Sequence, residues 1–373
     1  MNTTKNKTVF FLGAGFSCAA GAPSQKELLG KVLNYSGNNY GNPVDDYLDE
    51  LKKFLRDAFS LDDHKMKDFS LEDFYTPIDK CISQNSSFRG YSIDHIKKIR
   101  NELSTLISIV IDAELTNSDK DKTYLDKFVN LIIDFLNRDI KIIFPMHELA
   151  IITTNWDILL DKRFYLKSDQ QNFFVNLDYG TSTVYLKDAN YNSQLSPLSR
   201  LRRRIYDLEL YKIHGSLNWL KCPSCNRLFV NPEKKAGILE IDLNIRCKYC
   251  SDIFTFKTED YRGIYLEPQI IYPTFMKDLS NIHFNQIWDN ASVALSEASN
   301  IVFIGYSFQQ ADYEIRQLLS RKVPDNCKIT VVLNNNNNKE TFERYHNFFG
   351  RRTFKELDCG AEIFVKDYML EYL

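Results

Sequence analysis

Four cysteines form two closely spaced pairs in the second half of the chain. Cys222 and Cys225 make the first pair, Cys247 and Cys250 make the second, and 21 residues lie between the pairs. Two such knuckles supply the four thiolates that bind zinc tetrahedrally, whereas a redox dithiol would need only one pair. Because all four ligands are protein groups, no coordination position stays open for catalysis. The spacing therefore predicts a structural zinc ion that holds a loop or small lobe in place.

A histidine followed by glycine and serine comes directly after an expected strand. His214 comes directly after the strand-like run at residues 209–213. A lone histidine is usually structural, but an imidazole at a strand end can project into a crevice and accept a proton near neutral pH. The other five histidines lack this context. His214 is therefore the preferred general base.

Two polar side chains lie where another expected strand, residues 149–154, gives way to a helix. Asn155 and Asp157 are of the types that cap helix starts, which is a purely structural role. They would also lie at the carboxyl edge of a parallel sheet, where open α/β folds bind ligands. From the residues alone, both interpretations stand.

Glycine turns follow two further expected strands. Gly13 and Gly15 follow the run at residues 7–12, and Gly305 follows the run at 300–304. Glycine lets backbone amides approach a diphosphate, although it also ends strands for steric reasons alone. With residues 155–157 and 214, these turns predict one sheet edge along which a dinucleotide could lie.

The elements that must position these residues alternate between strands and helices. Short apolar runs at 7–12, 149–154, 209–213, 300–304 and 328–333 are separated by segments of helical periodicity. This alternation predicts an α/β fold with a parallel, doubly wound sheet.

More than a hundred residues separate the first two expected strands. Three apolar stripes at helical spacing, within residues 48–55, 93–110 and 125–136, indicate amphipathic helices. We interpret the region as a helical insertion that caps the active site or makes an oligomer interface. Residues 173–199 predict an irregular excursion, and the basic cluster from Arg200 to Arg204 is either a solvated helix face or a contact for a partner or phosphate.

Composition excludes several classes of protein. Lysine plus arginine (47) nearly balances aspartate plus glutamate (49), so no overall positive field draws the chain to nucleic acid, and the three lysines near the cysteine pairs make no convincing patch. No apolar stretch reaches the roughly 18 residues needed to span a bilayer, and the first apolar run leads into a glycine turn rather than a cleavage site. The eight cysteines do not form a secreted disulfide pattern. We expect a cytoplasmic protein that binds neither membranes nor, directly, nucleic acid.

In their order along the chain, these motifs resemble the sirtuin family. They are Gly-Ala-Gly-Phe-Ser with Gly21 and Pro23, then Thr-Asn-Trp-Asp, His-Gly-Ser, the two cysteine knuckles and Gly-Tyr-Ser. The resemblance covers most of the chain apart from the helical insertion. It implies a Rossmann-like doubly wound sheet with a helical insertion and a small zinc-ribbon lobe. The expected division is a core of residues 1–40, 141–218 and 260–373, an insertion of residues 41–140, and a zinc lobe of residues 219–259.

The resemblance also implies a role for each matching residue. NAD would be the substrate, with catalysis by Asn155, Asp157 and His214 and structural zinc on the four cysteines. The residues implied to contact NAD are Gly13, Ala14, Gly15, Ser17, Pro23, Asn155, Asp157, Gly305, Ser307 and Asn334.

Two departures distinguish the chain from sirtuins that deacylate proteins. Ser24-Gln25-Lys26 replaces an Asp-Phe-Arg stretch, and the peptide-binding pattern after the zinc lobe is missing. The insertion, Thr-Asn-Trp-Asp and Gly-Tyr-Ser-Phe look more like bacterial sirtuin-like proteins of anti-phage defence. That branch implies hydrolysis of NAD to nicotinamide and ADP-ribose, a homo-oligomer, and a partner protein such as an ATPase. An NAD-dependent protein deacylase and a non-catalytic sensor of NAD or ADP-ribose are the alternatives.

Overall fold

The structure is a computed structural model, and it describes residues 7–36, 42–138, 148–170, 174–186, 205–231, 245–251, 264–309, 312–334, 338–350 and 352–373. The basic cluster at residues 200–204 and the middle of the asparagine run, residues 335–337, lie outside the described residues.

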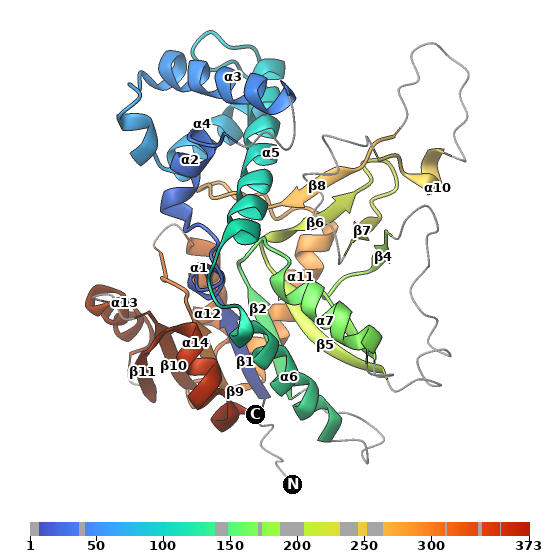
Figure 1. Cartoon of the computed structure of the whole chain (residues 1–373), viewed down its shortest axis with the longest axis vertical. Helices are drawn as coiled ribbons and strands as arrows, with labels where there is room; N and C mark the ends of the chain where they lie inside the picture. Colours follow the sequence, from blue (N-terminus) through green and yellow to red (C-terminus); the bar gives the residue numbers. More distant parts are fainter. Residues whose placement is uncertain are drawn as a thin grey trace.

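Seven strands of the described chain form one parallel sheet in the order β11-β10-β9-β1-β2-β5-β3 (Figure 1). The predicted parallel sheet and its five predicted strands are confirmed. The chain passes from β1 to β2 on one side of the sheet's centre and later to β9 on the other side, so β1 and β9 flank a point where the winding reverses. The strands are β1 (Lys7–Leu12), β2 (Leu149–Thr153), β3 (Phe174–Asp178), β5 (Ile205–Lys212), β9 (Ala298–Ile304), β10 (Lys328–Leu333) and β11 (Phe354–Asp358).

Helices cover both faces of this sheet. Phe10 and Phe11 are neighbours on β1 and therefore point to opposite faces. Phe10 packs edge-on against Phe128 of α6 (Thr123–Arg138), whereas Phe11 packs against Phe303, which in turn contacts Tyr345 of α13 (Lys339–Phe349). Figure 1 shows α6 and α7 (Leu159–Gln170) in front of the sheet and α11 (Ile282–Ser296) behind it. The sheet is thus doubly wound, as the sequence predicts.

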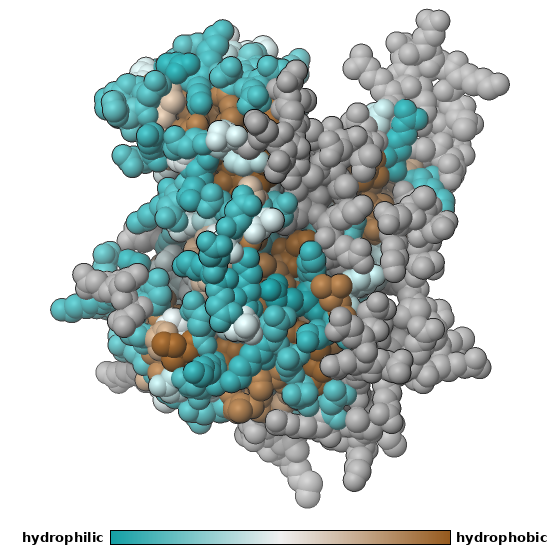
Figure 2. Space-filling view, viewed as in Figure 1, coloured by the Kyte–Doolittle hydropathy of each residue, from teal (hydrophilic) through white to brown (hydrophobic). Residues whose placement is uncertain are grey.

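The expected apolar stripes of the helical insertion are buried. Leu51 and Phe54 of α3 (Asn42–Phe59) and Ile99 and Leu106 of α5 (Ile93–Asn117) are fully or almost fully buried, and Phe128 of α6 is buried against the central sheet. The outer surface around α3 is mostly hydrophilic, as the upper part of Figure 2 shows. Among the described residues, no helix combines the length and the apolar character needed to cross a bilayer.

The described helices are α1 (Ala14–Cys18), α2 (Gln25–Leu33), α3 (Asn42–Phe59), η1 (Lys65–Asp68), α4 (Leu71–Ser83), α5 (Ile93–Asn117), α6 (Thr123–Arg138), α7 (Leu159–Gln170), α10 (Lys248–Ser251), α11 (Ile282–Ser296), α12 (Tyr313–Lys322), α13 (Lys339–Phe349), α14 (Gly360–Ile363), η2 (Phe364–Tyr368) and η3 (Met369–Tyr372).

A second, smaller sheet stands beside the first. Its order is β4-β7-β6-β8, with β4 (Thr183–Tyr185), β6 (Gly215–Lys221), β7 (Leu228–Val230) and β8 (Glu267–Ile270). It has its own small core, in which the buried cysteines pack with apolar side chains of the sheet. The prediction of an irregular excursion at residues 173–199 is wrong where β3 and β4 occur. Each of these strands pairs with a strand formed later in the chain, so local composition did not reveal it.

Two turns of the central sheet touch backbone to backbone. The amide of Gly13 donates to the carbonyl of Ile304 (3.0 Å), and the amide of Gly15 donates to the carbonyl of Gly305 (2.8 Å). A Cβ atom on Gly15 would lie 2.7 Å from Cα of Gly305, and one on Gly305 would lie 2.3 Å from the nitrogen of Phe16. No side chain fits between the turns, so these glycines are required by packing whether or not a ligand binds.

This contact predicts unequal costs for two glycine substitutions. Gly305 and Gly350 have the same φ of +64°, but nothing lies within 4 Å of a Cβ on Gly350. Gly350 has φ +64° and ψ −120°, a conformation that suits glycine, so we expect Gly350→Ala to lose about 1 to 3 kcal/mol of unfolding free energy from backbone strain alone. Gly305→Ala should lose about 1 to 3 kcal/mol more than Gly350→Ala, because its methyl group also overlaps main-chain atoms. Denaturant unfolding of both variants checks this, and equal losses would contradict it.

Candidate functional site

A cleft of about 1100 Å³ opens at the carboxyl ends of β1, β2 and β9. It therefore lies at the reversal point of the sheet, where open α/β folds bind ligands, and it is large enough for a dinucleotide. Gly13 is absent from its wall, because the space beside its Cα is filled by Tyr306. The structure brings the other predicted site residues together in this wall: Ala14, Gly15, Ser17, Pro23, Asn155, Asp157, His214, Gly305, Ser307 and Asn334.

The helical insertion supplies part of the same wall. Glu72 of α4, Glu114 and Asn117 of α5, and Ser118 line the cleft. The side chain of Gln25 donates to Glu72, so α4 is tied to the start of α2 beside the cleft. Burial raises the pKa of Glu72 above its ordinary value. This agrees with the hypothesis that the insertion caps the site.

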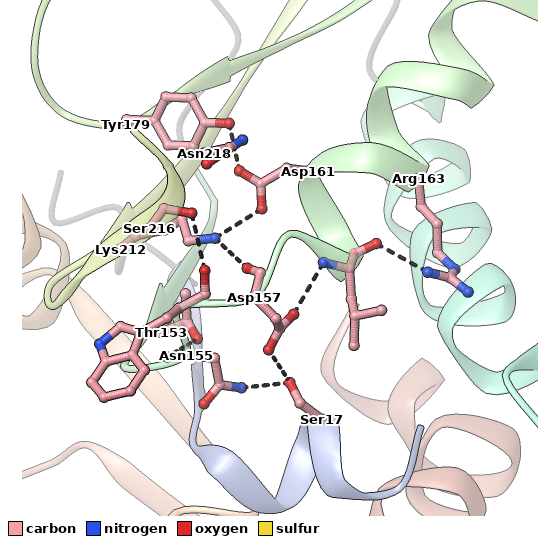
Figure 3. Close-up of polar contacts among 12 residues, drawn as sticks. Ser17, Thr153, Asn155, Asp157, Asp161, Arg163, Tyr179, Lys212, Ser216 and Asn218 are labelled. Carbon is pink, nitrogen blue, oxygen red and sulfur yellow. Dashed lines mark hydrogen bonds and ion pairs between the residues drawn. The ribbon is translucent and has the colours of Figure 1, made fainter. Parts of the chain in front are cut away.

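Ser17, Asn155 and Asp157 form one hydrogen-bonded network (Figure 3). The Ser17 hydroxyl donates to Oδ2 of Asp157 (2.6 Å) and accepts from Nδ2 of Asn155 (2.9 Å). Nδ2 of Asn155 also donates to the carbonyl of Gly13 (2.9 Å). Because the amide group is engaged on the protein side, the carbonyl oxygen Oδ1 of Asn155 is the atom left to meet a ligand.

The capping interpretation holds for one of the two polar residues after β2. Oδ1 of Asp157 accepts from the amide of Leu159 (3.0 Å), the first residue of α7. Asp157 is therefore both a helix cap and the acceptor that orients Ser17. No helix amide in the described ranges donates to Asn155, and its amide instead donates to the turn after β1.

His214 lies in the connection between β5 and β6. Its backbone carbonyl accepts from the amide of Ile271 (2.9 Å), and the preceding carbonyl, of Ile213, accepts from Nε1 of Trp288 (3.0 Å). The imidazole is buried, and its Nε2 makes no hydrogen bond to any described residue. Burial lowers the pKa of His214 from 6.5 to about 4, so the ring is neutral near pH 7 and Nε2 or Nδ1 can accept a proton.

An ion pair that the sequence did not reveal acts on this histidine. Lys277 contacts Asp312 (3.0 Å) and Glu314 (3.2 Å), and both Lys277 and Asp312 line the cleft. The carboxylate of Asp312 raises the pKa of His214, whereas the ammonium of Lys277 lowers it further below its ordinary value. Lysine and acidic residues are common in any chain, and 35 residues separate this pair, so no local pattern marks it.

A cysteine in the wall is not poised for nucleophilic chemistry. Cys18 lines the cleft next to Ser17. Burial, with smaller contributions from Glu27 and Asp157, raises the pKa of its thiol to about 11. Since the thiolate is the nucleophile, Cys18 is inert near neutral pH.

The four paired cysteines converge on one point. Their sulfur atoms all lie within 4.8 Å of one another, and the two cross-pairs, Cys222 with Cys250 and Cys225 with Cys247, are each 3.8 Å apart. Four thiolates about 2.3 Å from a tetrahedral zinc ion would be separated by about 3.8 Å, so this donor set fits zinc.

No family model and no curated protein matches this sequence. Solved structures of Sir2 enzymes are similar to it at low identity. One that concerns the mechanism and regulation of Sir2 enzymes is 12% identical, covering 98% of this chain and 92% of its own, with a TM-score of 0.42. A Sir2 homologue in complex with NAD is 13% identical, covering 98% and 89%, with a TM-score of 0.46. At this level the likeness carries no information about the reaction.

The cysteine geometry predicts one zinc ion per chain. We expect elemental mass spectrometry of the purified protein to find about one equivalent of zinc per chain. Cys247→Ser should lose most of this zinc, because the tetrahedral thiolate set is broken. Cys327→Ser is the matched control, since Cys327 is equally buried but lies outside the cluster. Equal zinc in both variants would show that the cluster does not bind the ion.

Proposed function

We propose that the cleft binds NAD and that this chain hydrolyses the bond between nicotinamide and ribose. The observation that carries the proposal is the buried Nε2 of His214, which has no hydrogen-bond partner in the described part of the chain and lies in the same cleft as Asn155. A buried polar atom without a partner is costly, and a ligand hydroxyl or water is the natural partner for it. The motif order that resembles sirtuins supports NAD as that ligand.

The reaction needs little acid catalysis from the site. Nicotinamide in NAD is already cationic at the ring nitrogen, so the bond to C1′ of the ribose can break with its electron pair leaving on nicotinamide. Positive charge then develops on the ribose, and oriented acceptors stabilise it. Water forms the new bond to C1′, and the products are nicotinamide, ADP-ribose and one proton.

Two side chains have the chemistry for the water step. Asn155 can accept a hydrogen bond from water through Oδ1, because its amide is held by Gly13 and Ser17. His214 can accept the proton from water or from a ribose hydroxyl and pass it to solvent. Asp157 acts on Asn155 through Ser17.

The resemblance to anti-phage proteins suggests a cellular role for the proposed reaction. In that setting the chain would be an effector of abortive infection that depletes NAD, acting as a homo-oligomer with a partner protein such as an ATPase. This extension rests on the motif resemblance alone.

The proposed reaction predicts loss of turnover in two variants. We expect zinc-replete protein to release nicotinamide and ADP-ribose from NAD, and Asn155→Ala and His214→Ala to lower kcat by about 100-fold or more, since each removes a proton acceptor or water-orienting group. Chromatography of the products measures this.

Matched controls and a peptide arm make the outcome decisive. Asn285→Ala and His346→Ala remove exposed residues of the same types and should keep the parent rate. Product formed only with an acetyl-lysine peptide, as O-acetyl-ADP-ribose, would favour the deacylase; NAD binding by calorimetry without product would favour the sensor.

The buried histidine predicts an unusual pH profile. Because the pKa of His214 is about 4, its ring accepts protons only above that pH. We expect kcat/KM to stay level from about pH 6 to 8 and to fall as the pH drops toward 4, where the imidazole becomes protonated. Circular dichroism at each pH separates this limb from acid unfolding. A folded enzyme whose activity is half lost near pH 6.5 would contradict the assignment.

A further inference from the structure

A buried lysine joins two segments of the cleft wall. Lys212 is the last residue of β5 and is 1% exposed. Its Nζ donates to the backbone carbonyl of Asp157 (2.5 Å) and to Oδ2 of Asp161 on α7 (3.0 Å) (Figure 3). Asp161 also accepts from the hydroxyl of Tyr179 (2.6 Å), and both of these side chains are buried. One ammonium group therefore ties β5, α7 and the turn after β2 together.

Main-chain bonds hold the carbonyls on both sides of Asp157, and the amide of Lys162 donates to the carbonyl of Ile158 after it (3.0 Å). The amide of Ile213 donates to the carbonyl of Thr153 (3.1 Å), and the amide of Leu217 donates to that of Trp156 (2.9 Å). The carbonyl of Asp157 lies one residue further on, and Nζ of Lys212 is the group that holds it.

Hydrogen bonds link Asp157 to the groups that face the ligand. Its carboxylate accepts from the Ser17 hydroxyl, and Ser17 accepts from the amide of Asn155. A shift of the Asp157 backbone would therefore reorient Asn155, although Lys212 itself contacts neither Ser17 nor Asn155. Displacements of about 1 Å in a catalytic site can cost on the order of 100-fold in rate.

Stability alone does not account for a buried ion pair at this place. Burying two charges is costly, and an uncharged, well-packed pair is often as stable as the ion pair that it replaces. The same sheet has a second buried pair, Lys7 with Glu209 (2.9 Å), near the amino end of β1. Neither Lys7 nor Glu209 lines the cleft, so this pair is a matched control.

We infer that Lys212 is a positioning residue that sets the orientation of Asn155 through the Asp157 carbonyl and Ser17. The inference rests on the proposed NAD hydrolysis for its effect on rate, but the effect on the Asp157 turn is independent of the reaction.

The test compares two uncharged double variants of the full chain. Lys212→Met with Asp161→Asn removes the ammonium, leaves no unpaired charge and keeps an acceptor for Tyr179. Lys7→Met with Glu209→Gln removes both charges of the control pair. Glu297, which also contacts Lys7 (3.5 Å), is partly exposed, so its charge stays partly hydrated. We expect kcat of the first variant to fall by about 10- to 100-fold with KM within about twofold, and the control to keep both constants. Denaturant unfolding shows that both variants are folded.

Hydrogen exchange gives a reading that needs no activity. The amide of Leu159 donates to Oδ1 of Asp157, so it should exchange several-fold faster in the Lys212 variant than in the parent and the control. The amide of Leu217, bound to Trp156, should not change. Unchanged kcat and unchanged Leu159 exchange, or equal effects in both variants, would overturn the inference. If the parent does not hydrolyse NAD, the proposed function fails, and Leu159 exchange alone still decides whether Lys212 positions the turn.

Discussion

The contact between the two glycine turns is the constraint on which the cleft depends. Gly15 and Gly305 leave so little space that the ends of β1 and β9 share main-chain hydrogen bonds beyond the sheet itself. Backbone contacts alone thereby fix the turn after β1. Ser17 lies on α1, directly after this turn, and its hydroxyl bonds to both Asp157 and Asn155. A steric fit thus anchors one side of the polar network.

Around the cleft, some buried polar atoms have protein partners, whereas Nε2 of His214 and Nε1 of Trp156 have none among the described residues. The Ser17 hydroxyl, the Asp157 carboxylate and the Asn155 amide group all have protein partners. Nε2 of His214 has none among the described residues. Buried polar groups are normally paired, because an unpaired one loses its hydration without compensation. Under the proposed function, this atom and Oδ1 of Asn155 are the ones that meet the ligand.

Sequence patterns predicted the features that depend on local composition. Central parallel strands are buried on both faces, so β1, β2 and β10 read as continuous apolar runs, and the cysteine spacing marked the four-cysteine cluster. The edge strand β11, Phe354–Asp358, was missed because most of its side chains are exposed and polar. The ion pairs of Lys212 and Lys277 could not be predicted, since each joins residues that only the folded chain brings together. The glycines were located correctly, but their packing role needed the opposite turn to be visible.

The helical insertion is part of the cleft even though its sequence interrupts the core. α5 runs for 25 residues from the contact with α3 to the loop after α1, where Ser118 would lie 2.1 Å from a Cβ on Gly21. Lys31 of α2 pairs with Glu114 of α5 (2.7 Å). Gly21 has a φ of +100° and can approach the insertion this closely because it lacks a side chain. Glycine at this position thus lets the loop that lines the cleft pack directly on α5, so the core alone would leave one wall of the cleft open to solvent.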